Sequence, residues 1–169
     1  RNLAAEALRA GLHGISTGTF YACAAEAPRE EIIAVCEPLA SIGGVFATHM
    51  RDETDRVLDS IEETAAIGKA LGVTAIISHH KVAGVQNHGR SEETLALIGR
   101  LQATQSLGLD CYPYSASSTV LRADRVRIAA RTVITVCKAY PAFVGREVGE
   151  LMRELGASVD TLCPRRPRA

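Results

Sequence analysis

Two histidines stand at the ends of two apolar segments, and imidazole is a common side chain at zinc sites and in acid–base chemistry. The first segment, GGVFATHMRDE, contains His49, and the second, GVTAIISHHK, ends in His79, His80 and Lys81. In a parallel α/β fold the carboxyl ends of neighbouring strands meet at one edge, where such folds place their chemistry. The spacing therefore predicts two imidazoles at adjacent strand ends, as in a metal site.

Side-chain alternation along a strand indicates which of the paired histidines faces His49. It groups His79 with Ile77 and Lys81 and turns His80 to the opposite face. Neutral imidazoles suit Zn²⁺, and a zinc hydrolase typically uses three protein ligands plus a water. We therefore predict His49 and His79 as zinc ligands. The alternative for each is a hydrogen-bonded core histidine.

Further polar side chains lie at the end of the second of these segments and in the next strand-like segment. Lys81 is expected either to pair with an anionic group of a substrate or to form a salt bridge at the rim, because an unpaired buried ammonium is costly. Tyr112 and Tyr114 share a strand face, where they either pack or orient a carboxylate through their hydroxyl groups. Ser118 lies in the polar loop 117–119 just beyond.

Composition excludes several classes of function. The chain has 169 residues, and its 19 Lys and Arg balance its 19 Asp and Glu. A formal charge of zero gives no support for binding nucleic acid or a membrane surface. No apolar run reaches the length of a membrane span. The five cysteines form no CxxC pair, which indicates a reducing compartment and a cytoplasmic location.

The chain alternates between strand-like and helix-like segments. Apolar strand-like runs cover residues 12–17, 45–49, 73–78 and 109–114, and an amphipathic segment with a helix-start signal follows each of the first three. Longer loops after the strands than before them suit a (β/α) barrel or a doubly wound sheet. The sequence contains no GxGxxG motif or P-loop, which weighs against nucleotide binding. Residues 127–136 are predicted to form a long strand or a bent pair, and residues 144–155 a short amphipathic helix.

Taken together, these motifs resemble the N-acyl-D-amino-acid deacylases (D-aminoacylases) of the amidohydrolase superfamily. The similarity runs from about Gly11 to about Gly156 and rests on seven segments: GISTGTFYA, GGVFATHMRDETD, EETAAIGKALGV, ISHHKVAG, GRSEETLALI, YPYSASSTVLRADRV and TVITVCKAYPAFVGREVGELMRELG. The resemblance implies a partial TIM-type (β/α) barrel, about strands four to seven, over residues 1–119. It leaves residues 120–156 as the start of an inserted subdomain and residues 157–169 as a disordered or off-family tail.

The resemblance also implies roles for individual residues. His49 and His79 match the zinc histidines of the family, and Tyr21, Lys81, Tyr112 and Ser118 match its contacts with the substrate. The implied reaction is the zinc-dependent hydrolysis of the amide bond of a small N-acyl-D-amino acid.

The chain lacks other parts of the family's site. The family's HxH pair and ligand cysteine precede the segment that matches Arg1, and the GSDG-type motif with the acid/base Asp is absent. We therefore identify no catalytic acid/base in this chain. We expect it to be an internal fragment that is inactive in isolation. The alternatives are another amidohydrolase, such as a dihydroorotase- or hydantoinase-like cyclic amidase, or a remnant without metal.

Overall fold

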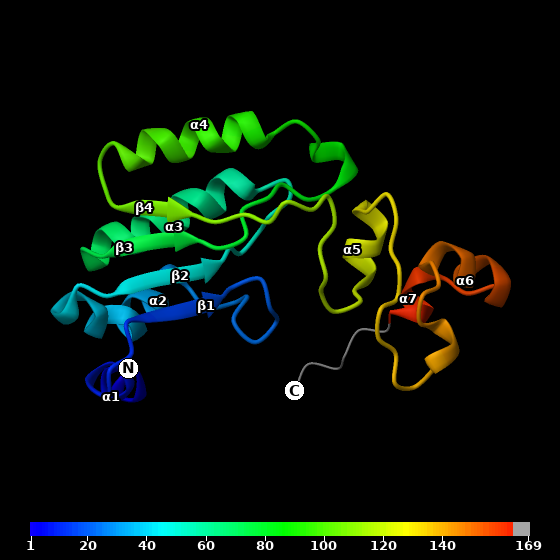
Figure 1. The fold of residues 1–169 in the computed structure, drawn as a ribbon, viewed down its shortest axis with the longest axis horizontal. Helices are drawn as coiled ribbons and strands as arrows, with labels where there is room; N and C mark the ends of the chain where they lie inside the picture. Colours follow the sequence, from blue (N-terminus) through cyan, green and yellow to red (C-terminus); the bar gives the residue numbers. More distant parts are fainter. Residues whose placement is uncertain (164–169) are drawn as a thin grey trace. The chain divides into compact units, whose positions relative to one another are not determined.

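The computed structural model describes residues 1–163, in which strands and helices alternate (Figure 1). The helices are α1 (Asn2–Arg9), α2 (Arg29–Cys36), α3 (Val57–Leu71), α4 (Ser91–Gln102), α5 (Ala123–Ile128), α6 (Val148–Leu155) and α7 (Val159–Leu162). The strands are β1 (Gly14–Gly18), β2 (Val45–His49), β3 (Thr74–Ile77) and β4 (Leu107–Leu109), and short 3-10 helices are η1 (Glu37–Ile42), η2 (Val85–Asn87) and η3 (Pro141–Phe143). Within residues 1–163 no helix is both long and apolar enough to cross a bilayer.

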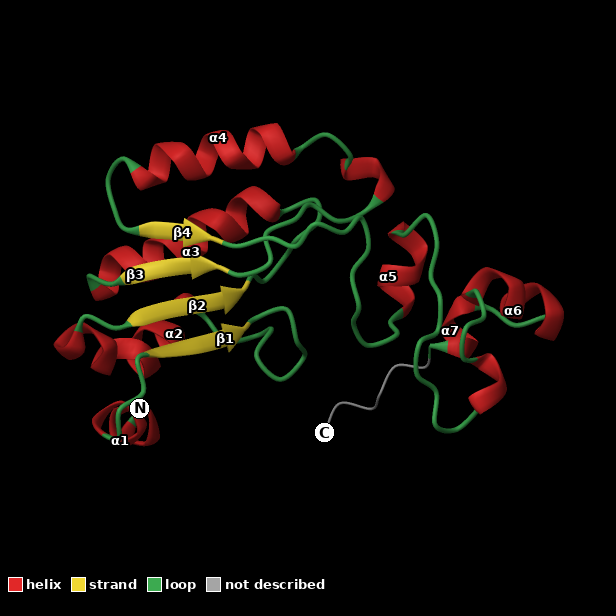
Figure 2. Ribbon diagram, viewed as in Figure 1, coloured by secondary structure: helices red, strands yellow, loops and turns green. Residues whose placement is uncertain are grey.

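The four strands form one parallel sheet in the order in which they occur along the chain (Figure 2). A doubly wound sheet reverses its strand order at a switch point, whereas each strand here pairs with the next one, as in a (β/α) barrel. The predicted partial barrel is therefore confirmed. The register places His49 beside Gly18 and Thr48 beside Ile77, so that the ends of β2 and β3 are neighbours.

The core lies between the sheet and its helices. Phe46, Ala75 and Ile77 of the strands are buried in one cluster with apolar residues of α2, α3 and α4. Helix α3 approaches the sheet closely, because a Cβ at Gly68 would lie 2.6 Å from the Cβ of Ala75. The face of the sheet that carries Ile77 is therefore the face that the helices cover.

Residue contacts divide the chain into two compact units. The first comprises Arg1–Val82 and Gly89–Pro113 and contains the sheet. The second comprises Ala83–His88 and, within the described part of the chain, residues 114–163. In the second unit α6 begins at Val148 and ends at Leu155, which confirms the amphipathic helix predicted there. The predicted tail, 157–169, includes α7, and its last six residues lie outside the described part of the chain.

Two predicted strands are wrong. The strand expected over residues 109–114 is Leu107–Leu109 instead, because its partner β3 stops at Ile77 and pairing cannot continue beyond that point. The long strand or bent pair expected over residues 127–136 is absent. Helix α5 occupies its first residues, and only Val133 forms an isolated bridge, to Glu147.

Asp52 and Ser91 are residue types that predict helix N-caps, but neither is the N-cap of its helix; the N-cap of α3 is Arg56. Asp52 accepts hydrogen bonds from the backbone N–H groups of Thr54 (2.6 Å) and Arg56 (3.3 Å), so it stabilises the turn before α3. Ser91 is the first residue of α4 rather than its N-cap, which is Arg90.

Arg51 joins the loop between β1 and α2 to helix α3. Its guanidinium donates to the carbonyl oxygens of Ala25 and Ala27 and forms a bidentate pair with Glu63 of α3, at 2.8 and 3.0 Å. The hydrogen bonds to Glu63 raise the pKa of the Arg51 guanidinium above its ordinary value. This contact fixes the loop that carries Tyr21.

The Arg51→Lys substitution tests this contact. A lysine keeps the charge but cannot make the bidentate pair and both carbonyl contacts. Hydrogen bonds to charged groups contribute about 1.5–3 kcal/mol, so the amide hydrogens of Ala24 and Ala27 should exchange at least about tenfold faster. Hydrogen–deuterium exchange measures this, and Arg56→Lys, at an exposed pair with Asp59, is the control. Equal exchange in the two variants would contradict the role of Arg51.

Candidate metal centre

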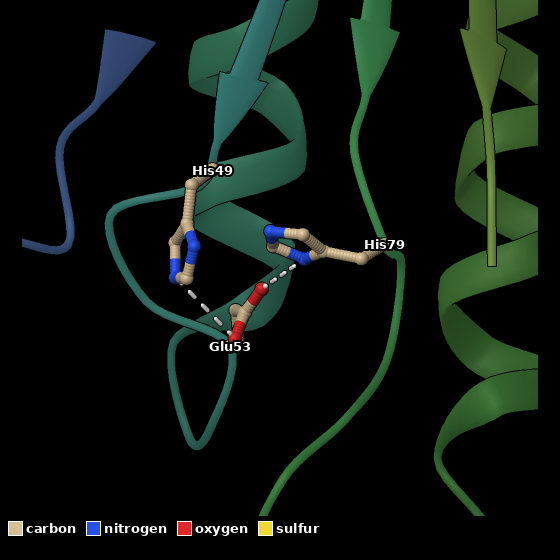
Figure 3. Close-up of side chains that lie close together, drawn as sticks. All are labelled: His49, Glu53 and His79. Atoms are coloured by element: carbon tan, nitrogen blue, oxygen red, sulfur yellow. Dashed lines mark ion pairs between the residues drawn. The ribbon is translucent and has the colours of Figure 1, made fainter. Parts of the chain in front are cut away.

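Three side chains able to bind a metal gather at the carboxyl edge of the sheet: His49, Glu53 and His79 (Figure 3). One ligand atom of each lies within 4.8 Å of those of the other two. The imidazole centroids of His49 and His79 are 4.5 Å apart, and the ring planes are inclined by 71°. The structure therefore brings together the two histidines that the sequence predicted to be neighbours.

His49 is the last residue of β2 and lies among aromatic rings of the loop between β1 and α2. The Phe20 ring stacks on its imidazole with a centroid distance of 4.8 Å, and the Tyr21 ring is tilted against it at 5.1 Å. The Thr19 hydroxyl donates to the His49 carbonyl oxygen at 3.2 Å. These contacts hold the imidazole in place and put Tyr21, a predicted substrate contact, beside it.

The backbone conformation that brings His79 to this site differs from the predicted one. Ile77 lies on the helix-covered face, so simple alternation would turn His79 toward the helices as well. His79 instead has a φ of +44°, in the left-handed region that a non-glycine residue rarely adopts. The prediction that Ile77 and His79 share a face is therefore wrong, although His79 does face His49. The left-handed backbone directs the imidazole toward His49.

Asp110, directly after β4, holds this backbone conformation. Its carboxylate accepts a hydrogen bond from the His79 N–H at 2.6 Å, and its carbonyl oxygen accepts one from the His80 N–H at 2.7 Å. Its own N–H donates to the Ile77 carbonyl oxygen at 3.1 Å. A strained φ persists only where surrounding contacts determine it, and Asp110 supplies three such contacts.

Glu53 is the residue of this site to which sequence reasoning assigned no role. It lies in the loop between β2 and α3, four residues after His49, and only 4% of its side chain is exposed. Its carboxylate is 2.7 Å from the Lys81 ammonium, 3.1 Å from His79 Nδ1 and 3.6 Å from His49 Nε2. A carboxylate four residues beyond a strand-end histidine was the available signal, but nothing in the pattern indicated its burial.

Lys81 lies on the side of the site shared by Glu53 and His79. Besides its pair with Glu53, its ammonium is 2.9 Å from His79 Nδ1 and donates to the His79 carbonyl oxygen at 3.1 Å. It also lies 5.8 Å from the centroid of the Tyr112 ring, within the range of a cation–π contact. Two of the predicted substrate contacts, Lys81 and Tyr112, are thus neighbours.

His80 faces away from the site, as the sequence predicted. Its Nε2 is 2.9 Å from the hydroxyl oxygen of Thr94, a buried residue of α4. Burial lowers the pKa of the His80 imidazole, and the nearby Glu53 only partly opposes this. The contact with Thr94 therefore joins the segment after β3 to α4, and the lowered pKa favours the neutral imidazole.

Ser118 belongs to the second unit, as does Tyr114. Both side chains are exposed. The role of Ser118 in substrate binding stays a prediction.

Comparisons with known proteins connect this geometry to a family. No protein-family model matches the chain. Over 169 residues it is 52% identical to an N-acyl-D-aspartate deacylase from Alcaligenes xylosoxydans xylosoxydans, a match that covers 97% of this chain and 34% of that protein. The chain therefore spans about a third of the length of this relative.

Solved structures agree with the sequence match. A D-aminoacylase whose crystal structure defines a novel subset of amidohydrolases is 53% identical, with a TM-score of 0.92 over 96% of this chain and 34% of that one. An N-acyl-D-glutamate deacylase from Bordetella bronchiseptica, complexed with zinc and a phosphonate inhibitor, is 34% identical, with a TM-score of 0.88 over 95% of this chain and 34% of that one. In sequence and in fold, this chain is similar to about one third of a D-aminoacylase, a protein from a subset of the amidohydrolases.

Proposed function

We propose that this chain forms part of the site of a zinc-dependent deacylase that hydrolyses the amide bond of N-acyl-D-amino acids. In this reaction water adds to the amide carbonyl carbon, the C–N bond breaks, and the nitrogen takes up a proton. The products are a D-amino acid and a carboxylate. The observation that carries the proposal is the pair of imidazoles, His49 and His79, whose centroids are 4.5 Å apart at the carboxyl edge of a barrel-type sheet.

The donor set fits zinc. Two neighbouring imidazoles are ligands that zinc prefers, and the N-acyl-D-glutamate deacylase with the same fold was solved as a zinc complex. A bound zinc ion would supply Lewis-acid chemistry, the polarisation of a carbonyl and the activation of a water. Since catalytic zinc sites usually have three protein ligands, we propose that further ligands come from regions of the longer relatives that have no counterpart in this chain.

The residues around the imidazole pair support a site for the substrate's carboxylate. Lys81 supplies a positive charge beside the imidazole pair, where its ammonium contacts Glu53, the carbonyl oxygen of His79 and Nδ1 of His79. We propose that Lys81 and the hydroxyl of the neighbouring Tyr112 hold the substrate's carboxylate. Tyr21, which is 40% exposed beside His49, and Ser118 are proposed contacts to the acyl group or the carboxylate.

The free thiols support a location inside the cell. All five cysteines, Cys23, Cys36, Cys111, Cys137 and Cys163, are unbridged in the structure. We propose a reducing compartment for the protein that contains this chain.

A chimera tests the proposed reaction. The corresponding third of a D-aminoacylase is replaced by this chain, and hydrolysis of N-acetyl-D-methionine and its L-isomer is measured with added zinc. We expect turnover of the D-isomer. His49→Ala or His79→Ala should each lower kcat/KM on the order of 10³-fold, the scale of losing a group that stabilises charge in the transition state.

His88→Ala serves as the matched control, since His88 is an exposed residue of the second unit. That variant should keep the activity of the unsubstituted chimera. A folded chimera without activity, or one whose activity survives His49→Ala, would contradict the proposed function.

A further inference from the structure

The carboxylate of Glu53 touches a different histidine with each of its oxygens. Oε2 lies 3.6 Å from Nε2 of His49, and Oε1 lies 3.1 Å from Nδ1 of His79. Each imidazole therefore presents one nitrogen to Glu53. The other nitrogens, Nδ1 of His49 and Nε2 of His79, face each other across the gap between the rings (Figure 3).

Two positions for a metal follow from this arrangement, one on the Glu53 side of the rings and one between the facing nitrogens. The Glu53 side already holds a cation. The Lys81 ammonium is 2.7 Å from Glu53 Oε1 and 2.9 Å from His79 Nδ1. A metal bound to the same two atoms would meet this ammonium at contact distance, where like charges repel strongly in a partly buried site. The facing nitrogens are therefore the better position.

We propose that Glu53 is a positioning residue and is not itself a metal ligand. It orients both imidazoles from the side opposite the metal. The carboxylate favours a hydrogen on Nε2 of His49 and on Nδ1 of His79, which leaves Nδ1 of His49 and Nε2 of His79 to bind the metal. Carboxylates commonly hold metal-binding histidines in this way, and they fix both the tautomer and the ring orientation. The inference rests on the proposed function, because it concerns the same metal site.

The distances distinguish the two contacts. Both are ion-pair contacts, and the 3.1 Å contact with His79 is closer than the 3.6 Å contact with His49. At His79 the Lys81 ammonium competes, because it could donate to Nδ1 and force the hydrogen onto Nε2. Lys81 also donates to Glu53 Oε1 and to the His79 carbonyl oxygen, so its third N–H is the one that competes with Glu53 for Nδ1. The tautomer of His79 is thus the sharpest test.

Nitrogen-15 NMR of the histidines in the 169-residue chain reads the tautomers directly. The spectra are recorded without metal and with one equivalent of zinc, about two pH units above the ordinary pKa of histidine. We expect hydrogen on Nε2 of His49 and on Nδ1 of His79 in both samples. Zinc should shift the resonances of Nδ1 of His49 and Nε2 of His79. Reversed tautomers, or zinc on Nε2 of His49, would overturn the proposal.

The Glu53→Gln substitution provides a second measurement. Loss of an orienting carboxylate typically weakens metal binding about 10–100-fold, so zinc affinity measured by chelator competition should fall by that factor. Asp59→Asn, at an exposed carboxylate of α3 that pairs with Arg56, is the matched control and should leave the affinity unchanged. Unchanged affinity in Glu53→Gln would overturn the proposal. If the unsubstituted chain binds no zinc, that result contradicts the zinc dependence of the proposed function. The histidine tautomers measured without metal then test the role of Glu53 on their own.

Discussion

The carboxylate of Glu53 is buried at the carboxyl edge of the sheet, and the cost of burying an unpaired charge is the constraint on which the site depends. The surrounding side chains meet this cost together, since Lys81, His79 and His49 all lie within 3.6 Å of the carboxylate oxygens. They come from two successive strand ends and their loops. A single buried group therefore fixes the relative positions of the residues that we assign to metal and substrate.

This arrangement also requires an unusual backbone. If the chain had continued past Ile77 as a regular strand, His79 would face the helices and the imidazole pair would not exist. The left-handed conformation at His79 reverses this direction, and Asp110 stabilises it through one side-chain and two backbone hydrogen bonds. Strain of this kind concentrates at functional sites, where it serves to aim a side chain. The site thus depends on a residue of the next strand end that binds no ligand in our account.

The strand and helix that position His49 were predictable, because they follow from the periodicity of apolar residues. Strand β2 has the predicted bounds, 45–49, and the apolar stripe after it forms α3. The role of Glu53 in the site was not predicted, because the sequence does not show that a carboxylate in a loop is buried. The face of His79 was predicted for the wrong reason, since alternation applies only while the backbone stays extended. The strand expected over 127–136 failed because no neighbour pairs with it beyond one bridge.

The position of a bound metal tests the central claim most directly. Crystals of the 169-residue chain grown with zinc would give an anomalous difference map at the zinc absorption edge. We predict a peak about 2.0–2.1 Å from both Nδ1 of His49 and Nε2 of His79, with Glu53 on the opposite side of the rings beside Lys81. A peak coordinated by the Glu53 carboxylate, or one away from both histidines, would contradict it.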